Sequence, residues 1–505
     1  MLFHSQLFLL CFAPLALAAW YAFDREYAVR RALMIAASLL FYGYWDPRLV
    51  PLLVLSVVLN WGIARLFHAL NDPGREQGAA PPAAPGPRPG GVVAGVGAHA
   101  AGPGPATART RFVRSAHTWL PALGVAINLA LLGWFKYADF IGASLAAAFG
   151  NPYTPLEVVL PLAISFFTFQ QISYLVDIRR GEVAPYSLAD YALYVCYFPQ
   201  LIAGPIVRHN EIIAQFRLAP RRPGFEQRLA RGLGLLCIGL VKKVFIADEL
   251  AKLCDPLFAR TQAGDVLSLA EAWAATAGFG MQLYYDFSAY SDMALGLGLM
   301  CGLVLPANFD SPYLASSLRQ FWRRWHMTLS RFLRDYLYIP LGGSRQGLPA
   351  VLAALLVTML LGGLWHGAAW TFVAWGAVHG VGLCVNHLWA RAGLRLPTVL
   401  GWTLTLIFVL LAWVLFRAES FASAALMYQS LAGLGAQVSD GGYREDLWVL
   451  WPALAIALLA PTSQRFALDL MPPNRALAAF AGLSMFVILL TVGDWRHVEF
   501  IYFQF

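Results

Sequence analysis

Two histidines in apolar surroundings are the residues of this sequence best suited to proton transfer. His326 lies in residues 319–340, where aromatic residues and leucines recur at intervals of three and four, with arginines between them. That spacing predicts an amphipathic helix up to Pro340. Its arginines would be costly in the middle of a bilayer, so we expect this helix at the membrane interface or facing a polar interior. Either position can bring His326 to the wall of a cavity.

His366 lies in residues 361–370, which read LGGLWHGAAW, inside a strongly apolar stretch. Glycines and alanines beside it allow neighbouring helices to approach closely, and they leave room for a long, thin substrate. An ionisable residue inside a membrane span is a functional hypothesis in itself. We therefore treat His366 as the second candidate catalytic residue.

Burial favours the neutral form of an imidazole, and a neutral histidine can accept a proton. Transfer of an acyl group from a thioester to a hydroxyl needs such a base, because the alcohol loses its proton as it attacks. A water-poor site also limits hydrolysis of the thioester. The structural alternative stays open, since an isolated buried histidine is more often a packing residue than a catalyst. For His379 and His387 the packing role is favoured.

Two other polar groups lie in apolar stretches. Residues 284–292 contain Asp286 and Asp292, which either orient a base or form structural ion pairs, and we favour the ion pairs. The expected partners are Arg319, Arg323 and Arg324. Residues 198–208 contain prolines and a glycine that interrupt a helix, and they either line a tunnel or form a tightly packed turn.

The elements that must position these residues are membrane helices. The chain has 505 residues, of which 59% are hydrophobic and only 13% charged, too few charges to cover a soluble fold of this size. Its net charge of +8 is carried by arginines and lysines in short links, which suits membrane topology rather than nucleic-acid binding. None of the six cysteines forms a CxxC pair, so neither a disulfide framework nor a metal site is expected.

Twelve stretches are apolar enough to be candidate spans of about 20 residues each. They are residues 5–23, 29–46, 48–70, 118–140, 156–177, 232–252, 269–301, 348–371, 373–390, 398–417, 446–461 and 476–493. Arginines follow the first, third and fifth of them, which predicts that the N-terminus lies outside and that these links are cytoplasmic.

Two segments break the simple alternation of spans and loops. Residues 187–207 are followed by another arginine-rich stretch, which predicts a re-entrant element that enters the membrane and returns to the cytoplasmic side. Residues 71–116 are rich in alanine, glycine and proline without a helical or strand period, which predicts a disordered cytoplasmic linker. We expect one membrane domain, residues 1–505, with this linker inside it.

Five segments, taken together, resemble the membrane-bound O-acyltransferase (MBOAT) family, in particular its bacterial branch that acylates alginate and teichoic acid. The matching strings are residues 198–208, 284–293, 309–313, 321–343 and 364–367, and residues 499–505 look like the ending of the alginate-type members. The resemblance implies an all-α polytopic membrane protein, with a multi-helix bundle around a central tunnel and re-entrant or interfacial helices. It also implies two key histidines, which map onto His326 and His366.

This resemblance leads to the prediction of an O-acetyltransferase in the bacterial inner membrane. The expected donor is a cytoplasmic acyl thioester, most simply acetyl-CoA, with no tightly bound cofactor and no metal. The expected acceptor is an exported polysaccharide such as alginate, reached through extracytoplasmic partner proteins. Arg323, Arg324 and Arg334 are weak candidates for binding an anionic donor headgroup. The alternatives are a related enzyme for teichoic acid, peptidoglycan or cellulose, a polymer or lipid transporter, and a non-catalytic scaffold.

Overall fold

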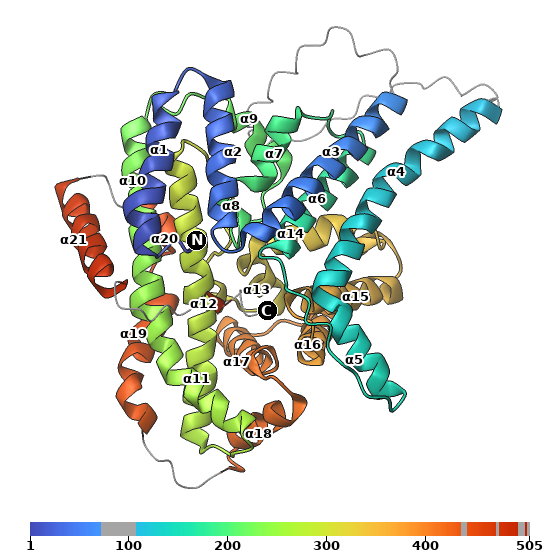
Figure 1. The fold of residues 1–505 in the computed structure, drawn as a ribbon. Helices are drawn as coiled ribbons and strands as arrows, with labels where there is room; N and C mark the ends of the chain where they lie inside the picture. The colour runs from blue at the N-terminus through green and yellow to red at the C-terminus, as the bar shows by residue number, and fades with distance from the viewer. Residues whose placement is uncertain (72–107, 436–441, 471–473, 493–499, 502–505) are drawn as a thin grey trace.

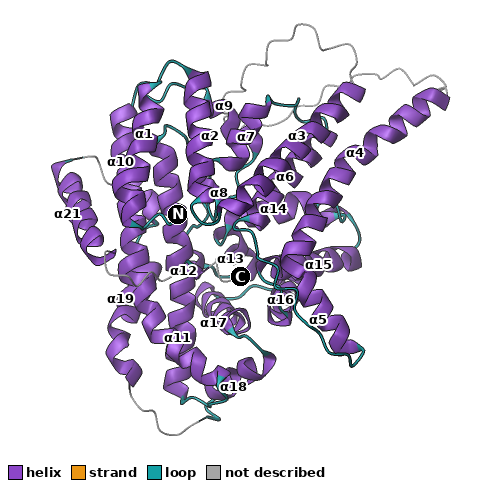
Figure 2. Cartoon of the chain, viewed as in Figure 1, coloured by secondary structure: helices purple, strands orange, loops and turns teal. Residues whose placement is uncertain are grey.

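The protein is a bundle of helices that cross at many angles around a buried centre (Figures 1 and 2). This computed structural model describes residues 1–71, 108–435, 442–470, 474–492 and 500–501. No strand occurs in those residues, so the predicted all-α membrane fold is confirmed.

The first half of the described chain contains twelve α-helices. They are α1 (Ala13–Ala22), α2 (Tyr27–Gly43), α3 (Val50–Asn71), α4 (Ala108–Leu132), α5 (Ala138–Ala148), α6 (Ile164–Arg179), α7 (Leu188–Cys196), α8 (Phe198–Leu201), α9 (His209–Phe216), α10 (Phe225–Val241), α11 (Asp248–Gln262) and α12 (Leu269–Met300). Short π-helices join several of them, among which η3 (Gly133–Tyr137) and η4 (Lys242–Ala247) matter below.

The second half supplies nine more. They are α13 (Leu318–Arg324), α14 (Met327–Leu333), α15 (Leu348–His366), α16 (Trp370–Arg391), α17 (Thr398–Arg417), α18 (Phe421–Leu431), α19 (Leu447–Leu459), α20 (Ser463–Arg465) and α21 (Arg475–Val492). The π-helix η6 (Arg334–Tyr338) continues α14.

The helix α12 lies in the core of the bundle, since nearly every residue along it is buried. The helix α10 lies directly against it (Figure 1), and the contact depends on glycine. A Cβ at Gly232 would lie 2.7 Å from the carbonyl oxygen of Gly296, and one at Gly239 would lie 2.7 Å from that of Ala289. Small residues thus let the two helices touch along their backbones.

Four helices in the described residues are long and apolar enough to cross a membrane. They are Pro47–Asn71, Trp119–Ala148, Leu348–His366 and Thr398–Arg417, and the bent pair Gly442–Leu459 and Ser463–Leu470 makes a fifth if it forms one span. The protein is therefore a multi-pass membrane protein. Four of the twelve candidate stretches therefore contain a helix that meets this criterion, and a fifth does if the bent pair is one span. Many of the others fold as shorter, interrupted or more polar helices.

Two predicted helices are interrupted. The stretch 156–177 is a helix only from Ile164, because Pro155 and Pro161 lie in a non-helical lead-in. The predicted helix 319–340 is broken at His326, between α13 and α14, where the backbone turns left-handed. The arginine and aromatic spacing is the same on both sides of the break, so the sequence pattern does not reveal it.

The segment 187–207 enters the bundle and returns, as predicted. It consists of α7, the one-turn helix α8 and an irregular stretch, and it is almost wholly buried. Its ends meet, since the hydroxyl of Tyr186 lies 3.1 Å from Nδ1 of His209. The predicted linker 71–116 lies for the most part outside the described residues, and α4 already begins inside it, at Ala108.

Candidate active site

The backbone break between α13 and α14 places His326 in the centre of the protein. His326 has φ +41° and ψ +54°, a left-handed conformation that a non-glycine residue adopts only when its surroundings impose it. The side chain is fully buried. The break therefore directs an imidazole into the interior at a point where a continuous helix would not.

Asn308, in the loop after α12, holds this break in place. Its backbone carbonyl accepts from the amide of Met327 at 2.9 Å, and its side-chain oxygen accepts from the hydroxyl of Thr328 at 2.9 Å. Its amide nitrogen donates to Ser291 at 3.1 Å. The backbone amide of Thr328, which can only donate, points to the same oxygen at 3.3 Å and so fixes which side-chain atom is the oxygen. That oxygen lies 3.1 Å from Nδ1 of His326.

The contact with Asn308 decides the tautomer of His326. Because an amide oxygen only accepts, Nδ1 of His326 carries the proton and Nε2 carries a lone pair. In the described part of the protein, Nε2 has no hydrogen-bond partner although it is buried. His326 is thus held with a proton acceptor exposed to the interior, which is the form a general base requires.

His366 is the last residue of α15 and is also buried. The end of this helix is fixed by two side chains of η3. Nζ of Lys136 donates to the carbonyl oxygens of Trp365 at 2.6 Å and His366 at 3.1 Å. The hydroxyl of Tyr137 donates to the carbonyl oxygen of Leu364 at 2.8 Å. A cation at a helix C-terminus also interacts favourably with the helix dipole.

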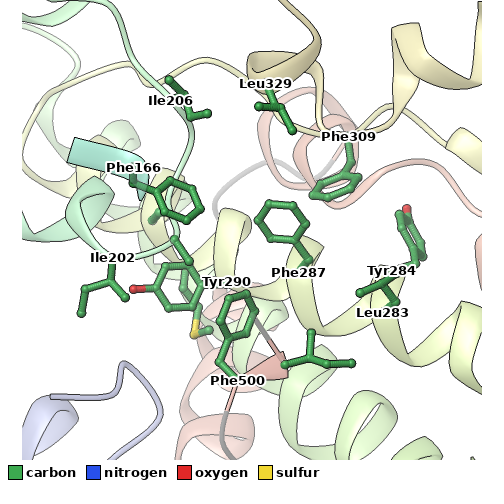
Figure 3. Close-up of a cluster of buried hydrophobic side chains, with 14 of the residues drawn as sticks. Phe166, Ile202, Ile206, Leu283, Tyr284, Phe287, Tyr290, Phe309, Leu329 and Phe500 are labelled. Atoms are coloured by element: carbon green, nitrogen blue, oxygen red, sulfur yellow. The ribbon is translucent and has the colours of Figure 1, made fainter. Parts of the chain in front are cut away.

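Trp365 brings the two histidines into one cluster. Its ring centroid lies 6.0 Å from that of His326 and 4.9 Å from that of His366. Phe287, on α12, packs edge-on against His326 at 4.7 Å and against Phe309 at 5.1 Å. Figure 3 shows Phe287 and Phe309 in the apolar cluster that forms this wall of the site. The residues singled out by sequence, 40 positions apart, therefore share one buried aromatic site.

A cavity of about 120 Å³ reaches this site from one side. Its lining includes His366, Trp365 and Lys136, together with Trp45, residues 160–166, Ile202 and Ala203. Trp45 precedes α3, whereas the linker follows α3, so the cavity lies toward the end of α3 opposite the linker. By the predicted orientation that end is extracytoplasmic.

The helix α6 connects this cavity to a group of arginines. It begins at Ile164 on the cavity and ends at Arg179, and its 16 residues span about 24 Å. Along it, Phe166 and Phe169 contact Trp365, each at 5.4 Å between ring centroids. The two histidines therefore lie beside a helix that has the cavity at one end and charged residues at the other.

At the far end of α6, Arg180, Arg208 and Arg334 surround Asp335. Arg208 and Arg334 form ion pairs with this carboxylate, and Arg180 donates to its backbone carbonyl at 3.1 Å. Burial would raise the pKa of Asp335, but the hydrogen bonds from Arg334 and Arg208 outweigh it and hold the pKa below its usual range. Arg180 also lies 3.7 Å from the carboxylate of Asp177, so the three guanidinium groups face two carboxylates and together keep a net positive charge.

The three arginines predicted as donor-binding candidates do not share one element. Arg334 lies on η6 in the group just described, whereas Arg323 is exposed on α13 and Arg324 donates to the carbonyl of Ser311 at 3.4 Å. Asp286 and Asp292 form buried ion pairs, as favoured by the sequence, but the predicted arginine partners are wrong. Their partners are Lys243 at 2.7 Å and Lys242 at 2.8 Å, both on η4.

His379 is fully buried, and Trp322 donates to its Nδ1 at 3.2 Å. His209 also has a buried network that the sequence did not suggest. Its Nε2 lies 3.1 Å from a carboxylate oxygen of Asp177, which also accepts from Tyr336 at 2.8 Å. Lys136 and Asn308 were missed as well. The only sequence signals for them were a lysine inside a predicted span and a polar residue just before the string 309–313.

Comparison with known proteins places the chain in a family. A family model described as MBOAT, membrane-bound O-acyltransferase family, matches residues 167–428. A peptidoglycan O-acetyltransferase of Helicobacter pylori is 37% identical over 466 residues, covering 86% of this chain and 80% of the relative. A probable alginate O-acetylase AlgI of Pseudomonas aeruginosa is 39% identical over 447 residues, covering 87% of this chain and 76% of the relative.

A more distant relative is a teichoic acid D-alanyltransferase of Streptococcus thermophilus. It is 28% identical over 241 residues, covering 46% of this chain and 57% of the relative. Both histidines, Trp365 and Asn308 fall inside the region that matches the family model.

Proposed function

The chain belongs to the membrane-bound O-acyltransferase family, and from that premise we propose that it moves an acetyl group from a cytoplasmic thioester, acetyl-CoA, toward hydroxyls of an exported polysaccharide. Acyl transfer as such is confirmed by the family and by the two relatives named as O-acetylating enzymes, over the transporter and scaffold alternatives. The names of those relatives support acetyl as the group and support alginate or peptidoglycan as the acceptor polymer.

We place the reaction at His326 and His366, and one observation carries this assignment. The rings of both histidines contact the same indole, that of Trp365, in the buried centre of the protein. Because Asn308 leaves a lone pair on Nε2 of His326, we assign His326 as the general base. His366 lines the cavity, so we assign it to positioning the incoming acceptor.

The step balances as an acyl substitution. The acceptor hydroxyl oxygen attacks the thioester carbonyl carbon while its proton passes to Nε2 of His326. The tetrahedral intermediate then collapses, the C–S bond breaks, and the leaving thiolate takes the proton from His326. Buried surroundings keep water from competing with the acceptor.

The two ends of α6 support a direction for this transfer. The arginine group at Asp335 attracts an anionic donor from the cytoplasmic side, and the cavity at His366 admits the acceptor from the extracytoplasmic side. This direction requires the N-terminus outside and the chain in the inner membrane. An extracytoplasmic partner protein would carry the group from the cavity to the polymer, because a cavity of about 120 Å³ is too small for a polysaccharide chain.

The test is acetylation of the exported polymer in cells that produce His326→Ala or His366→Ala, with the membrane level of each variant measured. We expect acetyl ester to fall by about 100-fold or more in both, because His326→Ala removes the general base and His366→Ala removes the group that positions the acceptor. The matched control is His387→Ala, a half-buried histidine on α16, which should keep wild-type acetylation. Normal acetylation in both histidine variants would overturn the assignment.

A further inference from the structure

The indole of Trp365 has a hydrogen-bond donor that nothing in the described structure uses. Its side chain is only 5% exposed, and Nε1 has no acceptor among the described residues. A buried N–H without an acceptor has lost its hydrogen bond to water without replacing it, so such donors are rare unless a ligand or water satisfies them. The donor therefore points to a bound group that carries an acceptor oxygen.

The position of this donor suits the reacting centre. The ring centroid of Trp365 lies 6.0 Å from that of His326 and 4.9 Å from that of His366, and Trp365 lines the same cavity as His366. A group bound in this cavity therefore meets the indole beside both histidines. This is the part of the protein in which the acyl carbonyl of the proposed reaction would lie.

The ring is also held rigidly. Phe169 stacks on it at an interplanar angle of 21°, and Phe166 packs edge-on against it at 68°. Its backbone carbonyl is fixed by Lys136. A donor that is already in position does not have to reorganise as charge develops, which is the property of an effective oxyanion hole.

An indole N–H without an acceptor is not shared by all the tryptophans of this fold. Trp20, Trp61, Trp322 and Trp402 all donate to protein acceptors. Trp375 and Trp413 also have unpartnered N–H groups in the described structure, but neither lines the cavity. Trp375 contacts His366 at 5.2 Å between ring centroids, so it is a close structural match for Trp365 without its place on the cavity.

We propose that the Nε1–H of Trp365 donates a hydrogen bond to the carbonyl oxygen of the acyl group and stabilises the oxyanion of the tetrahedral intermediate. This role rests on the proposed acetyl transfer. When the acceptor hydroxyl oxygen attacks the carbonyl carbon, the π electrons of the carbonyl move to the carbonyl oxygen. The hydrogen bond from the indole to that carbonyl oxygen then strengthens. When the C–S bond breaks, the double bond re-forms and the hydrogen bond weakens again.

The experiment compares Trp365→Phe with Trp375→Phe in the full-length chain. Membranes containing each variant at matched levels are given radiolabelled acetyl-CoA, and base-labile label is measured against donor concentration. We expect Trp365→Phe to lower kcat about 100-fold with little change in KM for the donor, since an oxyanion-hole donor is worth that much in the transition state. Trp375→Phe should lower kcat less than about 5-fold, because it removes only packing area near His366.

Several outcomes keep this inference separate from the proposed function. Loss of transfer in His326→Ala with near-normal kcat in Trp365→Phe would overturn the role of Trp365 and leave the acetyl transfer standing. Equal losses in the two tryptophan variants would also overturn it. Transfer that survives in both histidine variants would overturn the placement of the reaction at His326 and His366, on which the role of Trp365 rests.

A second replacement covers the case in which Trp365→Phe is not produced. A benzothienylalanine at position 365 keeps the shape of the side chain and replaces N–H by sulfur. It should reproduce the fall in kcat at normal protein level, and wild-type kcat in that protein would refute the inference.

Discussion

The side-chain oxygen of Asn308 lies 3.1 Å from Nδ1 of His326, and the same oxygen accepts a hydrogen bond from Thr328. One amide thus fixes both the backbone break that carries His326 and the tautomer of its ring. Since this oxygen also accepts from the backbone amide of Thr328 at 3.3 Å, the side chain cannot turn over without losing that bond. Asn308 is therefore a positioning residue for the candidate base.

Replacing Asn308 tests this relationship. We expect Asn308→Ala to lower kcat about 10- to 100-fold with a smaller change in donor KM, because the base loses its orientation and its fixed tautomer. Asn308→Asp keeps an acceptor oxygen, so it should retain more activity than Asn308→Ala. Its carboxylate favours the imidazolium, so the acidic limb of the pH–activity profile should move to higher pH. An unshifted profile in that variant would argue for a purely structural role.

Lys136 and Tyr137 give a second prediction, about the end of α15. Lys136→Met removes two charge-assisted hydrogen bonds to the carbonyls of Trp365 and His366, and it should reduce stability by about 2–4 kcal/mol. Tyr137→Phe removes one neutral hydrogen bond nearby and should cost about 1 kcal/mol. Thermal unfolding in detergent measures both. Similar shifts for the two variants would show that Lys136 has no special part in holding the helix end.

The glycines before Trp365 make a third test, because they differ in their surroundings. A Cβ at Gly363 would lie 2.3 Å from the carbonyl oxygen of Phe372 and 2.9 Å from Cα of Gly376, where α15 crosses α16. We expect Gly363→Ala to push the helices apart, with a cost of about 1–3 kcal/mol and a marked loss of membrane protein. At Gly362 the nearest atom is a flexible side-chain carbon of Leu333 at 3.3 Å, so Gly362→Ala should be produced normally. Western blots of both variants decide the comparison.

The buried lysine on η4 gives a fourth prediction. Nζ of Lys243 lies 2.7 Å from Asp286 and 2.8 Å from Asp248, and its side chain is 3% exposed. Lys243→Met leaves a carboxylate buried without its cation, which costs about 3–5 kcal/mol.

The matched control for Lys243 is Lys252→Met. It breaks the exposed pair of Lys252 with Glu249, at 2.6 Å, which is worth at most about 1 kcal/mol. Equal melting temperatures for the two variants would contradict the importance of the buried pair.

Much of the site was predictable from the sequence, because its signals are local. Histidines stand out in apolar stretches, since a polar group there is costly and needs a reason. The same argument identified Asp286 and Asp292 as ion-paired, and the arginine-rich stretch after residues 187–207 predicted a re-entrant element there. Family strings in the right order added the acyltransferase activity. The catalytic roles of His326 and His366 stay a prediction until the variants are measured.

The sequence by itself determined that the protein lies in a membrane, that its fold is all-α and which histidines are candidates for catalysis. Composition and residue spacing carry this information because they act over short stretches of chain. Only the tertiary structure decided how these residues meet. The break at His326 depends on Asn308, which is 18 positions away, and the end of α15 depends on Lys136, which is 230 positions from His366. Such contacts form only when distant segments pack together, so no local pattern encodes them, and the unpartnered N–H of Trp365 becomes visible only in that packed state.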